Sequence, residues 1–124
     1  MKYLSIVSVN LVSNVHTFEA LVSYLKSRPH DLASLTLSEC NFGSVHLLKL
    51  TEALYVNYQF EELDLSYNKL TAKQKSNQSI LRNLSLFVNK SFKLRHLNLQ
   101  GMHIKVMLDQ DAFQLNQVDS TKKV

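Results

Sequence analysis

The segment FEELDLSYNKL, from Phe60 to Leu70, decides the fold of this chain. Its apolar residues stand at positions 1, 4, 6 and 11 of the segment, and an asparagine stands at position 9. A helix repeats every 3.6 residues and does not produce this spacing. The spacing instead predicts a short strand at Leu63–Leu65 that sends two side chains into a core, followed by a turn. We expect the amide of Asn68 to hydrogen-bond backbone groups that the turn leaves unpaired in the interior.

The same pattern occurs twice more in the chain. It appears earlier, in 32–42, with Cys40 in the place of Asn68. It appears again later, in 94–104, where Met102 takes that place. A small, weakly polar thiol suits a buried turn, so we expect Cys40 to be a packing residue rather than a reactive one. Cys40 and Asn68 are therefore the structural candidates.

Helical periodicity separates the three segments. The stretch TFEALVSYLK at 17–26 has the i, i+3, i+4, i+7 stripe of an amphipathic helix, and Pro29 follows its end. A second helix is expected over 44–57, and a third includes 84–91, which has apolar residues at the same offsets as the second. The step from Leu63 to Leu97 is longer than the step from Leu35 to Leu63. We assign this surplus to the polar segment Thr71–Ser79, as a surface loop or an extra helical turn.

A degenerate first unit is expected near the N-terminal end. Its four apolar residues have the same mutual spacing as Leu32, Leu35, Leu37 and Cys40 of the second unit, and they are Leu4, Val7, Val9 and Val12. In this register Ile6 and Leu11 would lie off the core. The alternative is a secretion signal over Met1–Leu11, but polar residues interrupt its apolar stretch and no A-x-A-like cleavage site follows.

Together these units resemble the leucine-rich repeat, L-x-x-L-x-L-x-x-N/C-x-L, in the long, helix-containing class seen in ribonuclease inhibitor. The resemblance covers about residues 4–104. It implies an α/β solenoid of three to four repeats, in which a short curved parallel sheet lines the concave face and helices cover the convex face. We assign residues 1–118 to one repeat domain and 119–124 to a disordered tail. The chain is then either a piece of a longer array or a minimal array that needs a partner.

The resemblance also implies where a partner binds. In this family the side chains between the core leucines point out of the concave face and usually contact partners. From these positions we select the following partner-binding candidates: Glu39, Glu62, Asp64, Tyr67, Arg95, His96 and Asn98. The central unit is acidic with one tyrosine and the last unit is basic and polar, which suits a basic or mixed protein segment. The competing interpretation is a solvated sheet face without a ligand, because strand faces exposed to water are charged in any case.

Composition bounds the remaining classes of function. The chain has 124 residues, of which 45% are hydrophobic and 19% charged, as expected of one globular domain. Its lone cysteine forms no internal disulfide and favours a reducing, cytoplasmic compartment. No apolar run reaches the ~18 residues that span a bilayer. The net charge of +4 combines −3 over 1–68, +8 over 69–108 and −1 over 109–124. This basic block lacks aromatic residues placed for base stacking, which argues against a nucleic-acid partner.

No catalytic or metal-binding motif is visible. The five histidines form no HExxH and no i, i+4 pair, and the stretch DQD at 109–111 lacks the glycine and glutamate of a calcium loop. We therefore predict a non-enzymatic, cytoplasmic module for protein–protein interaction, with no cofactor and no small-molecule substrate. Two alternatives stay open. One is a regulator of another enzyme, such as a small-GTPase activator that acts through Arg95. The other is a secreted recognition domain with glycans at N-x-S sites such as Asn83 and Asn89.

Overall fold

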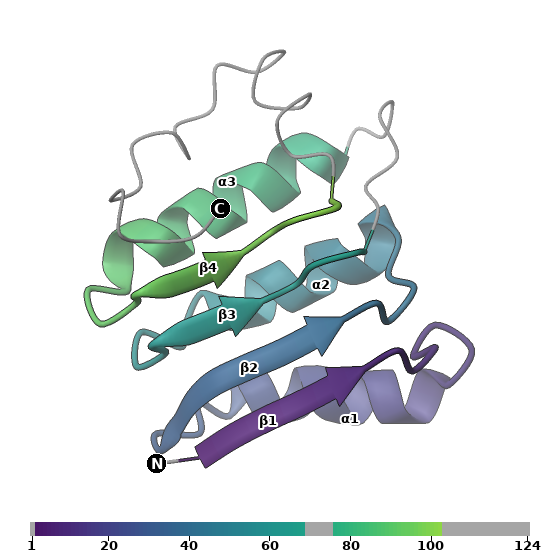
Figure 1. The fold of residues 1–124 in the computed structure, drawn as a ribbon, viewed down its shortest axis with the longest axis horizontal. Helices are drawn as coiled ribbons and strands as arrows, with labels where there is room; N and C mark the ends of the chain where they lie inside the picture. Colours follow the sequence, from purple (N-terminus) through teal and green to yellow (C-terminus); the bar gives the residue numbers. More distant parts are fainter. Residues whose placement is uncertain (1, 69–75, 103–124) are drawn as a thin grey trace.

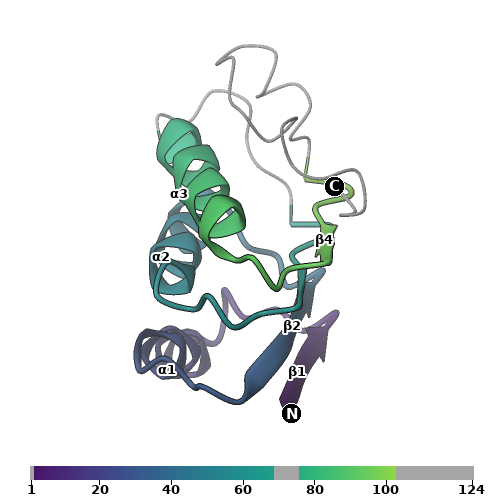
Figure 2. The ribbon, with the colours of Figure 1, turned by 90° about the vertical axis from the view of Figure 1, so that its left-hand side faces the viewer.

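The computed structural model describes residues 2–68 and 76–102 of the chain. Strands and helices alternate along it, and the four strands form one parallel sheet in the order β1-β2-β3-β4. The elements are β1 (Lys2–Val7), α1 (Val15–Lys26), β2 (Leu32–Ser38), α2 (Ser44–Leu54), β3 (Glu62–Asp64), α3 (Ser76–Lys90) and β4 (His96–Asn98). The helices lie side by side in one layer behind the sheet (Figure 1), and Figure 2 shows the two layers edge-on. The predicted α/β class with a parallel sheet is confirmed.

The strands β2, β3 and β4 pair in the register that the repeat pattern predicts. Leu35 lies beside Leu63, and Leu63 lies beside Leu97. The core positions of the three units are buried together: Leu32, Leu35, Leu37, Cys40, Phe42, Phe60, Leu63, Leu65, Asn68, Leu94, Leu97, Leu99 and Met102. The strand β3 begins and ends one residue earlier than predicted. Leu65 is nevertheless fully buried just beyond its end.

The side chain of Asn68 joins two neighbouring units. Its Oδ1 accepts hydrogen bonds from the backbone N–H groups of Cys40 (3.0 Å) and Phe42 (3.2 Å) in the preceding unit. Its Nδ2 lies 2.7 Å from the carbonyl oxygen of Leu37, and 3.0 and 3.2 Å from those of Leu65 and Ser66. Asn68 is fully buried, so these bonds pair backbone groups that water does not reach.

The predicted register of the first unit is wrong. That register would place Leu4 beside Leu32 and Val7 beside Leu35, but β1 pairs with β2 so that Leu4 lies beside Leu35 and Ile6 beside Leu37. Leu4, Ile6 and Val12 pack against the core, and Leu11 is 1% exposed. The expected core residues Val7 and Val9 are instead 51% and 44% exposed.

The extra residues of the first unit lie in the turn between β1 and α1. There the Oδ1 of Asn10 accepts hydrogen bonds from the backbone N–H groups of Val12 and Ser13, at 3.1 and 3.2 Å. This local turn lengthens the first unit. The predicted register is taken from the shorter step between Leu35 and Leu63, which is the length of the second unit.

Two helices begin or end at residues other than those predicted. The helix α2 ends at Leu54, three residues earlier than predicted, and the Nδ2 of Asn57 then bonds the carbonyl oxygens of Ala53 and Leu25, both at 2.9 Å. The helix α3 begins at Ser76, so the last four residues of the expected loop form a first helical turn. This outcome fits the extra-turn alternative for those residues. Residues 71–75 of the expected loop and the predicted tail at 119–124 lie outside the described residues.

Aromatic side chains pack between the first two helices and the sheet. The ring centroids of Phe18 and Phe42 are 5.5 Å apart, and the ring of His46 lies edge-on to Phe18 at 5.0 Å and stacked on Phe42 at 6.2 Å. Desolvation lowers the pKa of His46 below its ordinary value, and the nearby charge of Lys49 lowers it further. The neutral imidazole is therefore the form that the folded chain favours.

We expect Asn68→Ala to lower the free energy of unfolding by at least about 3 kcal/mol, because each buried backbone group left unpaired costs about 1–3 kcal/mol. Urea denaturation followed by circular dichroism measures the change. Asn89→Ala, at an exposed position on α3, is the matched control and should leave the midpoint nearly unchanged. Equal midpoints for the two variants would contradict the central role of the Asn68 amide.

A second prediction concerns acid. Because the pKa of His46 is lowered in the folded state, the unfolded chain binds this proton more readily. The corresponding stability is complete above the ordinary pKa of about 6.5 and is lost as the pH falls below it. Thermal melts at pH 7.5 and 5.5 should show a larger loss of Tm in the wild type than in His46→Phe, which keeps an aromatic ring but does not titrate. The same loss in both proteins would assign the acid sensitivity to other groups.

Candidate functional site

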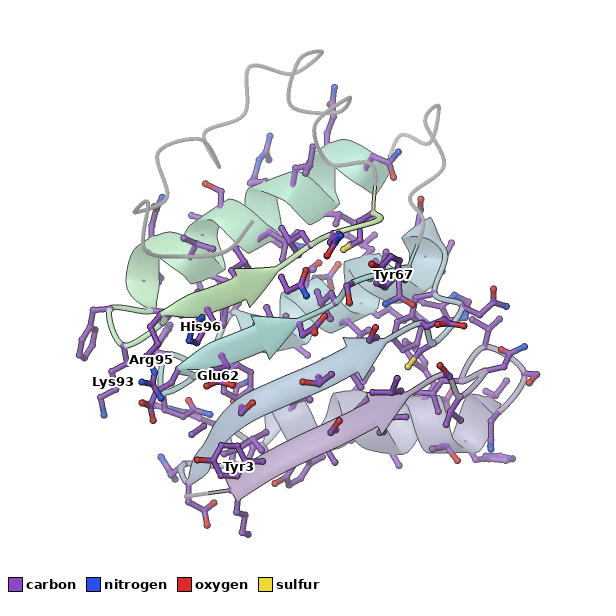
Figure 3. All side chains as sticks on the ribbon, viewed as in Figure 1. Tyr3, Glu62, Tyr67, Lys93, Arg95 and His96 are labelled. Carbon is purple, nitrogen blue, oxygen red and sulfur yellow. The ribbon has the colours of Figure 1, made fainter. Side chains whose placement is uncertain are left out.

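The face of the sheet opposite the helices is the candidate site. Side chains alternate along a strand, so the residues between the buried leucines point away from the helix layer. We call the following set the open face: Tyr3, Ser5, Val7, Ser34, Thr36, Ser38, Glu62, Asp64, Ser66, His96, Asn98 and Gln100. Two of its members, Ser34 and Ser66, are buried among their neighbours. Figure 3 views the sheet from this side and labels Tyr3, Glu62 and His96 on it. No described helix covers it.

At the amino ends of β3 and β4, charges of opposite sign lie together. The Nε of Arg95 is 3.6 Å from a carboxylate oxygen of Glu61, and its Nη2 is 3.8 Å from Oε1 of Glu62. The other oxygen of Glu62 accepts a hydrogen bond from the hydroxyl of Ser34 at 3.3 Å. The acidic centre and the basic last unit expected from the sequence are therefore neighbours that neutralise each other in part. Ion pairs this exposed stabilise a fold by at most about 1 kcal/mol, so they can exchange for a partner's charges.

The centre of the open face is a polar network. One oxygen of Asp64 accepts a hydrogen bond from the backbone N–H of Ser66 at 2.9 Å, and the other lies 3.4 Å from the amide nitrogen of Asn98. Asn98 repeats the local bond, since its Oδ1 accepts from the backbone N–H of Gln100 at 3.1 Å. The hydroxyls of Ser38 and Ser66 are 2.9 Å apart. Asp64 and Asn98 thus shape the turns that follow their strands in addition to facing solvent.

The turns at the carboxyl ends of the strands repeat one backbone conformation. Four residues at equivalent positions have positive φ: Ser8 (58°), Glu39 (54°), Tyr67 (60°) and Gly101 (78°). The N–H of Glu39 bonds the carbonyl oxygen of Ser66 at 2.9 Å, and the N–H of Tyr67 bonds that of Gln100 at 2.8 Å. These bonds between units offset the cost of the left-handed conformation, which is about 1–2 kcal/mol for a residue with a side chain.

Tyr67 packs against the next turn. A Cβ added at Gly101 would stand 2.5 Å from Cδ1 and 3.0 Å from Cε1 of the Tyr67 ring. The ring therefore occupies the space that glycine leaves, although Tyr67 remains 52% exposed. Glycine suits position 101 for two reasons: the backbone φ is positive there, and the Tyr67 ring approaches closely.

The structure divides the predicted partner-binding residues into two groups. Glu62, Arg95 and His96 gather at the amino ends of the strands, whereas Tyr67 lies at the opposite ends (Figure 3). Glu39 occupies the turn position equivalent to Tyr67, and Asp64 and Asn98 lie between the groups. Glu62 and Tyr67, both from the acidic central unit, therefore lie at opposite ends of β3 (Figure 3).

Sequence reasoning missed Tyr3, which is 66% exposed on the open face. The missed signal is the period-2 alternation in KYLSIV, where Leu4 and Ile6 point inward and Tyr3, Ser5 and Val7 point outward. The predicted register applies the step from Leu35 to Leu63 to this segment as well. It therefore assigns Val7 to the core and leaves Ile6 out.

Part of the basic block contacts tyrosines on the opposite side of the molecule. The Nζ of Lys90 hydrogen-bonds the hydroxyl of Tyr55 at 2.5 Å and lies 4.1 Å from the centre of that ring. This hydrogen bond raises the pKa of Lys90. The guanidinium of Arg28 lies 5.5 Å from the ring of Tyr58. Cations of the chain itself thus occupy these aromatic rings, which leaves them poorly placed for stacking on bases.

Cys40 lies in the interior, 0% exposed, with its Sγ 3.4 Å from the carbonyl oxygen of Ile6. Burial raises the pKa of its thiol, which keeps it protonated and unreactive at neutral pH. Within residues 2–68 and 76–102, no three His, Cys, Asp or Glu side chains cluster as metal ligands would. In the same ranges, no helix has the length and apolar character needed to cross a bilayer.

The contact between Tyr67 and Gly101 generates a prediction. We expect Gly101→Ala to destabilise the protein by about 1–3 kcal/mol, because alanine is strained at positive φ and its Cβ displaces the Tyr67 ring. Tyr67→Asn removes the ring, and asparagine tolerates positive φ. In a double-mutant cycle followed by urea denaturation, Gly101→Ala should cost less in the Tyr67→Asn background than in the wild type. Additive effects would show that the ring does not constrain position 101.

Comparison with known proteins gives no match: no protein-family model, no curated protein and no solved structure matches the chain. This result carries no evidence for or against any function.

Proposed function

We propose that the chain is a non-enzymatic, cytoplasmic interaction module of the leucine-rich-repeat type that binds a protein segment on its open face. The observation that carries the proposal is the asymmetry of the sheet. In the described part of the chain, three helices cover one face, and the other face presents polar and aromatic side chains, several of them held in place by hydrogen bonds. A surface made of regular strands positions its side chains rigidly, which limits the entropy that binding costs.

The alternation of strand and helix and the equal burial of the repeated leucines support the repeat assignment. So does the position of Asn68, whose amide bonds backbone groups of two units. In this assignment the sheet is the concave lining of a short solenoid and the helices form its convex side. The stacking of units supplies a core that no single unit can form.

The chemistry of the open face suits an extended segment of mixed character. Arg95 and His96 offer hydrogen-bond donors at one end of the strands, and Tyr67 offers an exposed ring at the other. Glu62 lies beside Arg95 and Asp64 lies between the two ends, and both offer acceptors. A partner that carries both a carboxylate and a basic or amide group would replace the internal contacts of these residues. Its carboxylate would pair with Arg95, and its basic or amide group would bind Asp64.

Two alternatives remain as competing proposals. A regulator of a small GTPase would need Arg95 to reach a phosphate, and the ion pairs with Glu61 and Glu62 would have to open first. A secreted recognition domain would carry glycans. Asn89 is exposed on α3, whereas Asn83 is half-buried with its amide on the hydroxyl of Thr51 at 3.1 Å. The intact polar network on the open face favours the binding module over both.

Site-specific photocrosslinking in cells tests the proposal. A photoreactive residue at the exposed position 96 or 100 of the open face should capture a defined protein, and one at the exposed positions 52 or 82 of the helices should not. Capture only from the helix positions would overturn the assignment of the open face.

The captured partner then allows a measurement of affinity. We expect Tyr67→Asn and His96→Ala each to weaken binding roughly 10-fold or more, as exposed anchors at an interface do. Leu86→Ala, at a residue of α3 that is 39% exposed, is the control and should bind like the wild type. Asp64→Asn removes the charge but keeps an acceptor for the N–H of Ser66, so it separates a role in binding from a role in folding.

A further inference from the structure

The outer edge of β1 is an unprotected strand edge. β1 is the first strand of the order β1-β2-β3-β4, so no described strand pairs with its outer side. It lies at the margin of the sheet with α1 behind it (Figure 1). Proteins usually protect such edges with charged residues, proline or a bulge. From Tyr3 to Val7 the strand contains no charge and no proline, and its one irregularity of pairing lies between Lys2 and Tyr3.

The sequence of β1 matches itself when it runs antiparallel. With Ser5 opposite Ser5 of a second copy, Tyr3 stands opposite Val7, and Leu4 stands opposite Ile6. Directly opposed residues of antiparallel strands lie on the same face of a sheet. The exposed Tyr3 and Val7 would thus meet on the open face, and Leu4 and Ile6 would meet on the helix side. Each of these two apolar pairs occurs twice, once on each side of the two-fold axis, as an isologous contact requires.

A groove beside the strand extends this match. It has a volume of about 470 Å³ and lies between β1 and α1, lined by Leu4 and Leu32 of the strands and by Ala20, Leu21 and Tyr24 of the helix. In the two-fold arrangement the helix sides of both copies face the same way. The groove of one copy would therefore lie against α1 of the other, which covers apolar surface on both.

We propose that two copies of this chain associate through β1, antiparallel, about a two-fold axis at Ser5, to form one continuous sheet. Charge favours a second copy over an unlike partner. The only charged residue of the strand, Lys2, is paired with Asp31 at 3.4 Å, so the edge neither repels an identical neutral edge nor attracts a charged one. The contact uses only the part of the open face on β1, and the parts on β2, β3 and β4 stay uncovered in this dimer. The dimer is therefore independent of the partner binding proposed above, and either can fail alone.

Sedimentation of the full chain tests the association. One strand edge and one groove form a small interface beside the ~800 Å² that each partner of a standard complex buries. We therefore expect a monomer–dimer equilibrium at concentrations between about 1 μM and about 1 mM. Ser5→Lys places two like charges at the two-fold axis and should weaken the dimer roughly 10-fold or more. Ser5 is exposed, so the folded content of this variant by circular dichroism should equal that of the wild type.

Disulfide trapping tests the register itself. Directly opposed residues of antiparallel strands have Cα atoms about 4.5–5.5 Å apart, which lies within the range of a disulfide. Ser5→Cys should give a covalent dimer on mild oxidation that a reductant reverses. Ser13→Cys, at an exposed position beyond the strand, and the wild type with its buried Cys40 should stay monomeric under denaturing conditions. A chain that sediments as a monomer throughout overturns the proposal. So does a dimer that survives Ser5→Lys or that Ser5→Cys does not trap.

Discussion

The fully buried amide of Asn68 is the contact on which the arrangement of the units depends. One of its atoms accepts from two N–H groups of the preceding unit, and the other donates to carbonyl oxygens of both units. In the proposed repeat assignment, a single unit does not bury its own face and the units have to stack. Apolar packing is non-directional and does not by itself choose a register. The amide does, because its bonds form only when the turns of two neighbouring units lie in step.

Hydrogen bonds between units also fix the turns at the edge of the open face. At the equivalent position of the first three turns, the backbone is left-handed at Ser8, Glu39 and Tyr67, and hydrogen bonds between units hold these residues there. The conformation turns the chain back toward the helix layer after each strand. It also projects the side chains of Glu39 and Tyr67 outward from the turns. The position of Tyr67, a candidate for binding, is thus a direct consequence of how the units stack.

The sequence predicted the elements whose signal is a repeated apolar spacing and missed those whose signal is polar. The pairing of Leu35, Leu63 and Leu97 followed from the spacing alone. The first turn of α3 could not be told from a loop by this spacing, because Asn77 is buried through its bond with the hydroxyl of Ser44 at 2.8 Å, and a buried amide resembles a loop residue in any hydrophobic pattern. The register of β1 failed because Asn10 forms a local turn. The ion pairs of Arg95 join residues of two different units, and spacing within one unit does not reveal them.

These internal pairs change what the open face can recognise. By sequence its centre is acidic, but Arg95 lies against Glu61 and Glu62, and Asp64 accepts from Ser66 and Asn98. A partner bound there would meet carboxylates whose charge Arg95 offsets only in part, together with many fixed hydrogen-bonding groups. Net charge would steer any oppositely charged molecule toward the sheet, whereas fixed groups reward only a segment whose own donors and acceptors match them. The polar network thus favours selection by shape and hydrogen bonding, and the exposed rings of Tyr3 and Tyr67 supply apolar contact on the first and third strand units.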